Sequence, residues 1–534
     1  TTFGSSPSHT GRHPAALNLT YFRPAWNATV QSGFALNRAA IANGRAVIVP
    51  QSRFATGISV RALDLQTGAS QWSFPVPSSN STNPPSIHQD RVYFQRGKGF
   101  SDVPQLFCLN ATNGSQVWVS TFGAQWESYE APAVTDQGIF VNGGTYGGMY
   151  GFNHDGSERF FHSLAQYDRW TPTIANGRLF SWVAGGFTEH NPNDGSPLWS
   201  INSGSSTSTV SAVSGNSAAL ISTTDLICVD LPSRSIRWRV NSAHRGSPAI
   251  ADGRVFAIQG NAVRSYSLSD GSASVVYQTT DAASTTLVDQ PILFNDRLVV
   301  SSEQKTWVFQ LDGKLLQTLN AGGRLSYSNS YLLAAGQDGT LRAFRAVHDN
   351  ANLASLSLSV AEISPQFDKD VTEYITTVPF GTTSTTVAPV LEQADASLTV
   401  NGAANAPVAL VVGNNTISVR VLAEDGVTEK TYRVVVTRLP QEFVFHSSAD
   451  VPVSSNGFVA GSYPVVIRLA YAPQPGTTLT MVNNTSLQWI IGSFSNVIHG
   501  QKITLSHDGD RYDFVVNYFG GTGNDLVLQW ADTS

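Results

Sequence analysis

Cysteine and methionine are scarce in this sequence, which has two residues of each among 534. Two cysteines are too few for a disulfide framework or for a zinc site built from cysteine alone. No run of 18 apolar residues occurs, so the sequence predicts no transmembrane segment. Charged residues make up only 13% of the chain and the net charge is −6, which argues against nucleic acid as a partner, because nucleic-acid-binding proteins carry a strongly basic surface.

The composition, the length and the distribution of charge indicate a globular protein with several domains. Hydrophobic residues reach 41%, and there are 45 glycines and 11 tryptophans. At roughly 150 residues per domain, the length predicts about three to four domains. Residues 1–352 carry 24 basic and 22 acidic side chains, a net charge of +2, whereas residues 353–534 carry 8 and 16, a net charge of −8. This asymmetry indicates separate modules.

A repeat of about 40 residues fills the first 345 positions. Its first half is an aliphatic residue followed by a tight Asn-Gly or Asp-Gly turn and a β-run, as in residues 39–45, 172–178 and 248–254. Successive copies lie 37 to 47 residues apart and are marked by Ile41, Ile87, Val134, Ile174, Val213, Ile250 and Leu293.

The second half of each copy is a turn followed by a tryptophan. Residues 62–72 (Ala-Leu-Asp-Leu-Gln-Thr-Gly-Ala-Ser-Gln-Trp) recur at residues 108–118, and shortened or worn copies lie near Asp155, Asp194, Asp230, Asp270 and Asp312. The Asp or Asn starts the turn and the Gly adopts the positive φ that the turn requires. We expect the Trp to pack between neighbouring sheets.

Four short strands per unit, repeated about eight times, predict an eight-bladed β-propeller, with seven blades as the alternative. The last copy ends at Phe344 without its turn and tryptophan. The segment Leu17–Phe22 has the pattern of a β-strand and is a candidate for the missing part, so that both ends of the propeller sequence would meet in one blade. Such closure removes exposed sheet edges from the ring.

The turn-and-tryptophan pattern resembles the tryptophan-docking repeat of the pyrroloquinoline-quinone (PQQ)-like propeller superfamily, over residues 1–345. This superfamily includes quinoprotein alcohol dehydrogenases and the outer-membrane assembly lipoprotein BamB. The resemblance implies a fold rather than an activity, because one fold hosts many functions.

Within that superfamily, the resemblance to the dehydrogenases implies a quinone held against a disulfide of adjacent cysteines, with calcium on acidic and amide ligands. Cys108 and Cys228 are 120 residues apart at equivalent repeat positions, so we expect two buried thiols that cannot reach each other. The blades also lack long insertions that could cap an active site. The sequence therefore argues against PQQ and against dehydrogenase activity, and it predicts no cofactor.

Two β-rich modules follow a polar joint at residues 346–352. Residues 353–439 alternate strands with Asp-Gly turns and resemble the bacterial cadherin-like β-sandwich domain, without the calcium motifs of true cadherins. Residues 441–534 are again strand and turn, and they resemble the terminal β-modules of large secreted or surface proteins of bacteria. The predicted fold class is therefore all-β: a propeller in residues 1–345 followed by two β-sandwich-like domains.

Calcium is an open alternative at one place in the last module. Residues 520–528 fit a single calcium-binding nonapeptide of the repeats-in-toxin type, with Asn524 and Asp525 as candidate ligands. That motif binds calcium through stacked copies, so a glycine-rich hairpin is the competing interpretation.

The candidate binding residues lie in loops that precede the innermost strands and that, on a propeller, surround one mouth of the central channel. Tyr, Trp and Arg are typical of binding hot spots, although the tryptophans could instead fill gaps between blades and the charges could simply be solvated. The candidates are Trp126, Glu127, Tyr129, Glu130, Tyr167, Asp168, Arg169, Trp170, His244, Arg245, Asp289 and Arg324.

Together these features predict a non-catalytic secreted or cell-surface protein with a structural or interaction role. The propeller would be a binding or assembly platform, and the tail a stalk or self-association element, with proteins, further copies of the chain or a surface glycan as partners. One alternative is an adhesin or receptor for glycan or protein. Another is a carbohydrate-active lyase or glycosidase whose carboxylates converge from distant blades, since the local motifs of serine hydrolases, zinc proteases and phosphate loops are missing.

Overall fold

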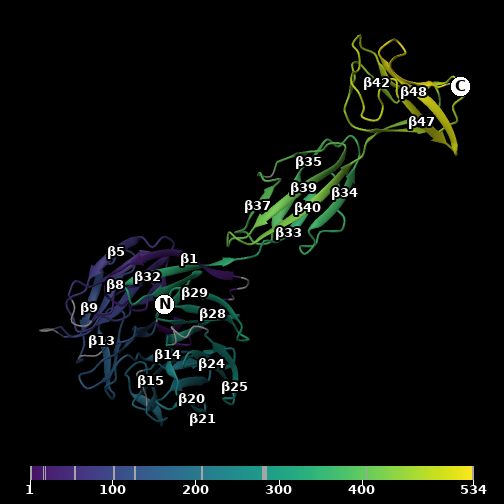
Figure 1. Cartoon of the computed structure of the whole chain (residues 1–534). Coiled ribbons are helices and arrows are strands. Elements are labelled where there is room, and N and C mark those ends of the chain that lie inside the picture. Colours follow the sequence, from purple (N-terminus) through teal and green to yellow (C-terminus); the bar gives the residue numbers. More distant parts are fainter. Residues whose placement is uncertain are drawn as a thin grey trace. The chain divides into compact units, whose positions relative to one another are not determined.

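The computed structural model describes residues 3–15, 17, 20–52, 56–99, 103–125, 128–205, 209–279, 286–404 and 406–531. The chain divides into two compact units, Thr1–His348 and Asp349–Ser534 (Figure 1). Within the described ranges the chain is all strand and turn apart from one 3-10 helix, η1 (Phe3–Ser5). No helix in those ranges is both long enough and apolar enough to span a lipid bilayer.

The first unit is built from eight four-stranded antiparallel sheets. Contacts between the first strands of neighbouring sheets show that these strands surround the axis of the ring. Seven sheets each take four consecutive strands, with the innermost strand first: β2 (Ala40–Ala42), β3 (Arg45–Ile48), β4 (Ser59–Asp64) and β5 (Ser70–Pro75); β6 (Ser86–His88), β7 (Arg91–Arg96), β8 (Gln105–Asn110) and β9 (Gln116–Thr121); β10 (Ala133–Thr135), β11 (Gly138–Asn142), β12 (Gly148–Phe152) and β13 (Glu158–Ser163); β14 (Thr173–Ala175), β15 (Arg178–Val183), β16 (Gly186–His190) and β17 (Pro197–Asn202); β18 (Ala212–Ser214), β19 (Ser217–Ile221), β20 (Asp225–Asp230) and β21 (Ser235–Asn241); β22 (Arg245–Ala251), β23 (Arg254–Gln259), β24 (Ala262–Ser267) and β25 (Ala273–Gln278); β26 (Leu287–Leu293), β27 (Arg297–Ser302), β28 (Thr306–Gln310) and β29 (Leu315–Leu319).

The eighth blade joins the two ends of the propeller sequence. Its strands, from the axis outward, are β30 (Arg324–Ser328), β31 (Tyr331–Ala335), β32 (Thr340–His348) and β1 (Thr20–Thr29). The prediction of eight blades is confirmed, and so is closure by an N-terminal strand, although β1 extends to Thr29 and begins later than the expected Leu17. Trp26 of β1 pairs with Ala343, the position that Trp72 occupies opposite Ala62, so β1 supplies the tryptophan that the last copy lacked.

Tryptophans of the outer strands join four of the blades to the next blade. Their indole N–H groups donate to backbone carbonyl oxygens of the following blade: Trp26 to Leu65 at 2.9 Å, Trp72 to Ala111 at 3.0 Å, Trp118 to His154 at 2.9 Å and Trp238 to Leu268 at 3.1 Å. The ring of Trp72 lies directly against Gly114, where a Cβ would come within 2.5 Å of it. The turn therefore needs glycine for its φ of +73° and for the close approach of the indole.

The N-terminal segment, residues 3–15, lies along the inner edges of four consecutive blades. Backbone N–H groups of the innermost strands donate to its carbonyl oxygens at 2.8–3.0 Å: Ile174 to Pro7, Val213 to Ser8, Ile250 to Thr10 and Leu293 to Gly11. His9 is fully buried, and its Nε2 lies 3.0 Å from the carbonyl oxygen of Pro172. The segment thus satisfies edge groups that would otherwise face the axis unpaired.

The second unit contains two β-rich cores, one formed by residues between Ala351 and Val436 and the other by residues between Phe443 and Leu528. In the first, β34 lies parallel to β40 and the other pairs are antiparallel. Its strands are β33 (Leu353–Leu358), β34 (Glu373–Val378), β35 (Ser384–Thr385), β36 (Val387–Leu391), β37 (Ser397–Val400), β38 (Val408–Ala409), β39 (Gly413–Leu422) and β40 (Glu429–Arg438).

The second core mixes parallel and antiparallel pairs around a five-stranded sheet with the order β42-β45-β49-β48-β47. Its strands are β41 (Gln441–Phe445), β42 (Val453–Ser455), β43 (Val459–Ala460), β44 (Val465–Leu469), β45 (Thr478–Asn484), β46 (Ile491–Gly492), β47 (Lys502–His507), β48 (Asp510–Gly520) and β49 (Asp525–Trp530).

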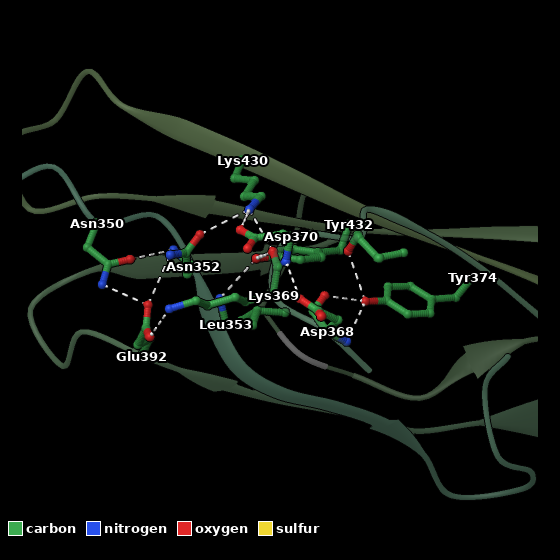
Figure 2. A network of polar contacts seen from close by, with 11 residues as sticks. Asn350, Asn352, Leu353, Asp368, Lys369, Asp370, Tyr374, Glu392, Lys430 and Tyr432 are labelled. Atoms are coloured by element: carbon green, nitrogen blue, oxygen red, sulfur yellow. Dashed lines mark hydrogen bonds and ion pairs between the residues drawn. The ribbon is translucent and has the colours of Figure 1, made fainter. Parts of the chain in front are cut away.

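A polar network fastens the joint after β32 to the first core of the second unit (Figure 2). The carboxylate of Glu392 accepts hydrogen bonds from the side-chain amides of Asn350 at 2.9 Å and Asn352 at 3.0 Å, and it pairs with Lys369 Nζ at 2.9 Å. These three donors lower the pKa of Glu392 to about 2. Lys430 Nζ donates to Asn352 Oδ1 at 3.0 Å. The network explains why residues 349–352 belong structurally to the second unit.

Replacing Gly114 by alanine tests the docking of Trp72 against a matched glycine. Gly44 has a similar φ of +71° but nothing within 4 Å of its Cβ position. Both substitutions carry the same backbone strain, and only Gly114→Ala also forces a methyl group into the indole ring. We expect Gly114→Ala to lower the free energy of unfolding in urea by about 1–3 kcal/mol more than Gly44→Ala. Equal losses for the two variants would contradict the docking role.

Candidate functional site

The loops that precede the innermost strands enclose a cavity of about 240 Å³ at one mouth of the propeller. We call this cavity the mouth cup. It draws residues from five blades, and the polar side chains that matter for its chemistry are Asn37, Gln51, Asn83, Glu130, Arg169 and Arg324. Four of the sequence candidates, Tyr129, Glu130, Arg169 and Arg324, thus meet in one site.

A charge cluster lies beside the cup. Asp289 Oδ2 lies 3.0 Å from Arg38 Nη2, and its Oδ1 lies 3.5 Å from Arg324 Nη1. Burial by itself would raise the pKa of Asp289, but the guanidinium groups of Arg38 and Arg324 outweigh burial and hold that pKa below its ordinary value. Asp289 therefore stays ionised and fixes two arginines that come from opposite ends of the propeller sequence.

Glu130 has a different environment from Asp289. Burial raises the pKa of its carboxyl group to about 7, and the effect is partly offset by Arg324, with smaller effects from Asp289, Arg38 and Arg169. Within the described residues, the Glu130 side chain makes no hydrogen bond and no ion pair. The cup therefore contains a carboxyl group that is half protonated near neutral pH.

Backbone hydrogen bonds between loops of three blades position these side chains. The Tyr129 N–H donates to Asn83 Oδ1 at 2.8 Å, and the Arg169 N–H donates to the Ser128 carbonyl oxygen at 2.9 Å. In return, the Ser128 N–H donates to Asp168 Oδ1 at 3.2 Å. The cup is thus held by the loops themselves, and Asp168 acts as a positioning residue rather than as part of the cavity wall.

The N-terminal segment lies beneath the charge cluster. Arg38 lines a second, smaller cavity together with Gly4, Gly11 and His13. Gln290, the neighbour of Asp289, donates its side-chain N–H groups to the His9 and Pro248 carbonyl oxygens at 2.5 Å. The axis of the ring is therefore occupied below the cup by residues of the same chain.

The remaining sequence candidates lie elsewhere. Trp170 is only 2% exposed and packs in an apolar cluster with Phe140, Ile174 and Leu179, so the structure corrects the expectation of a mouth-surface tryptophan: this ring fills a gap between blades. His244 is buried against Tyr266, whose hydroxyl lies 2.9 Å from its Nε2.

Two further candidates, Tyr167 and Arg245, do not enter the cup. Tyr167 is half-buried and uses its carbonyl oxygen to accept from Asn142, whereas Arg245 is exposed at the start of β22. Trp126 and Glu127 lie outside the described residues.

Several residues of the site were not among the sequence candidates. Arg38 lies in the loop before the innermost strand β2, as Arg169 lies in the loop before β14, and its place in an equivalent loop is a signal that could have identified it. Asn37, Gln51 and Asn83 carried no comparable signal, because single amides in loops are common.

The cysteines do not form the adjacent pair that the resemblance to quinoprotein dehydrogenases implies. Cys108 lies in β8 and Cys228 in β20, and both are free and buried. Burial raises the pKa of each thiol to about 11, so both are inert as nucleophiles. These residues do not fit the quinone site of those enzymes.

The calcium candidates have structural partners. Asp525 accepts a backbone N–H bond from Thr522 at 3.1 Å within the tight turn between β48 and β49, and another from Asn484 at the end of β45 at 2.8 Å. Asn524 Oδ1 accepts the Thr522 hydroxyl at 2.8 Å. In the described part of the chain, no three His, Cys, Asp or Glu residues are grouped so that they could hold a metal ion.

Comparison with known families gives two matches. The family model of the outer membrane protein assembly factor BamB matches residues 56–171 and 184–346, which is more than half of the chain. The model of the cadherin-like β-sandwich domain matches residues 353–439. No curated protein matches the sequence.

Solved structures with similar folds share little sequence with this chain. BamB from Moraxella catarrhalis is 13% identical with a TM-score of 0.48, covering 61% of this chain and 98% of its own. Quinohemoprotein alcohol dehydrogenase from Comamonas testosteroni is 10% identical with a TM-score of 0.49, covering 64% of this chain and 80% of its own. Sqt1 from Saccharomyces cerevisiae is 10% identical with a TM-score of 0.48, covering 61% and 99%.

The raised pKa of Glu130 predicts a specific dependence of stability on pH. Between the unfolded value of about 4.3 and the folded value of about 7, the folded state binds more protons than the unfolded state, so stability falls as pH rises. The variant Glu130→Gln lacks this proton. We expect its urea-unfolding free energy, relative to the wild type, to rise across that window by at most about 4 kcal/mol and to stay level above pH 7. A difference that does not change with pH would contradict the burial of this carboxyl.

Proposed function

Because the chain belongs to the family of the outer membrane protein assembly factor BamB and carries a cadherin-like β-sandwich domain, we propose that it is a non-catalytic interaction protein that acts outside the cytoplasm. The propeller presents a docking face to a protein partner, and the tail is the stalk that carries it. The name of the family supports a protein as the partner, and both domain types support a location outside the cytoplasm.

The mouth cup is the observation that carries this proposal. Interface hot spots are well-packed pockets at the centre of a contact surface, and arginine is enriched in them. The cup has these properties: two arginines in its wall, loops that are braced by their own hydrogen bonds, and a position at the centre of one face of the ring.

A binding role fits the charged residues of the cup better than a catalytic role. Asp289 forms ion pairs with Arg38 and Arg324, so its carboxylate is not available as a catalytic base. Burial raises the pKa of the thiols of Cys108 and Cys228, so neither is a nucleophile. Among the described residues, Glu130 is the one carboxyl group in the cavity wall, whereas the hydrolysis of a glycosidic bond requires two carboxyl groups that flank the bond. The described wall therefore favours binding over the hydrolysis of a glycoside.

A photo-crosslinking residue placed on the mouth face tests the proposal. Benzoylphenylalanine at Ser128 lies at the cup, whereas the same residue at Asp136 lies at the other end of the innermost strand β10, where the side chain is 83% exposed. In cells that export the full chain, we expect Ser128 to give a covalent adduct with a protein of defined mass and Asp136 to give none. Equal labelling from both positions, or no protein adduct from Ser128, would contradict a docking face at the mouth.

A further inference from the structure

We propose that the mouth cup receives a single acidic side chain, aspartate or glutamate, of a protein partner. This inference rests on the proposed function and adds to it the chemistry that the site selects. Four properties of the cup carry it: its charge, its two unpaired side chains, its size and its coupling to a proton.

The charge of the cup favours an anion. Among the described residues, the charged side chains in the cavity wall are Arg169, Arg324 and Glu130, and beside the wall the charges of Arg38 and Asp289 balance each other. The charge of the wall is therefore +1 when Glu130 is ionised and +2 when it is protonated. Such an excess attracts a negative group, because charges interact more strongly at a partly enclosed protein surface than in bulk solvent.

Two side chains of the cup are available to a ligand. Among the described residues, the exposed guanidinium group of Arg169 makes no hydrogen bond or ion pair, and neither does the carboxyl group of Glu130. A ligand carboxylate accepts two hydrogen bonds at once from a guanidinium group. Its free lone pairs can also accept the O–H of a protonated Glu130, so one carboxylate satisfies both residues.

The size of the cup selects a side chain rather than a larger molecule. Sites for cofactors and drug-sized ligands enclose about 300–1,000 Å³, whereas the mouth cup encloses about 240 Å³. A cavity of this size, open on one face, suits the anchor residue of a protein interface. The N-terminal segment prevents a longer ligand from passing further along the axis.

Protonation of Glu130 couples binding to pH. The charged groups that face Glu130 are Arg324 of β30, Asp289 of β26, Arg38 before β2 and Arg169 before β14. When Glu130 is neutral it donates to the incoming carboxylate, and when it is ionised it repels it. Since the pKa of Glu130 is about 7, one proton is taken up on binding above that pH, and affinity falls as pH rises.

The probe for this test is the blocked peptide acetyl-Gly-Glu-Gly-amide, titrated into the full chain by calorimetry at pH 6 and pH 8. We expect binding about tenfold weaker at pH 8, as the linkage of one proton requires. The matched peptide acetyl-Gly-Gln-Gly-amide should not bind. In Glu130→Gln the amide still donates, so we expect equal affinity at both pH values.

Arg169→Ala should weaken binding at least tenfold at both pH values. Arg234→Ala is its control, because Arg234 is also exposed and has nearly the same φ, +55° against +56°, but lies in the β20–β21 turn. Equal losses in the two variants, or retained pH dependence in Glu130→Gln, would overturn the proposal. Tighter binding of methyl glucuronide than of the glutamyl peptide would overturn the choice of a protein ligand.

The peptide titration and the crosslinking experiment can fail independently, so they distinguish the acidic anchor from the docking face. If the glutamyl peptide does not bind while Ser128 still crosslinks to a protein, the acidic anchor is wrong and the docking face stands. If neither result is obtained, the proposed function itself fails.

Discussion

The inner edges of the blades set the main constraint on this propeller. A ring of sheets places the first strand of every blade at the axis, and each such strand turns backbone N–H and C=O groups toward the centre. Groups of this kind are costly when buried without partners. Here residues 3–15 supply carbonyl oxygens to β14, β18, β22 and β26, so four of the eight inner edges are paired by the chain itself.

This pairing makes the two mouths of the central channel different. Below the charge cluster, the axis is filled by the segment that contains Gly4, His9 and His13, whereas above the cluster the loops leave the mouth cup open. Asp289 holds Arg38 and Arg324 at the boundary, and its charge is balanced there. Among the residues that the structure describes, Glu130 makes no ion pair, and its raised pKa lets it keep a proton near neutral pH at a cost to stability. A group of that kind is commonly found where a ligand binds.

The sequence predicted the features that depend on local pattern. Turn glycines and tryptophans recur at fixed positions, and from them the blade number and the closure by an N-terminal strand could be inferred correctly. The sequence could not predict that residues 3–15 pair with the innermost strands at the axis. This pairing depends on backbone carbonyl groups, which every residue type provides. Arg38 and Asp289 meet only after the ring closes, so no spacing in the sequence relates them.

The aromatic residues show a second limit of sequence reasoning. A tryptophan before an innermost strand can face the mouth or fill the gap between blades, and the sequence allows both. Trp170 fills a gap, because Phe140, Ile174 and Leu179 surround it. Glu130, Arg169 and Arg324 line one cavity at the mouth, and their role in binding stays a prediction.

The most direct measurement is hydrogen–deuterium exchange, resolved to single residues, of the intact chain and of a variant that lacks residues 3–15 but keeps β1. In the intact chain, the amides of Ile174, Val213, Ile250 and Leu293 should exchange as slowly as core amides such as Val47. In the variant those four should exchange rapidly while Val47 stays protected. Rapid exchange of the four in the intact chain, or no change on deletion, would contradict the closure of the axis by the N-terminal segment.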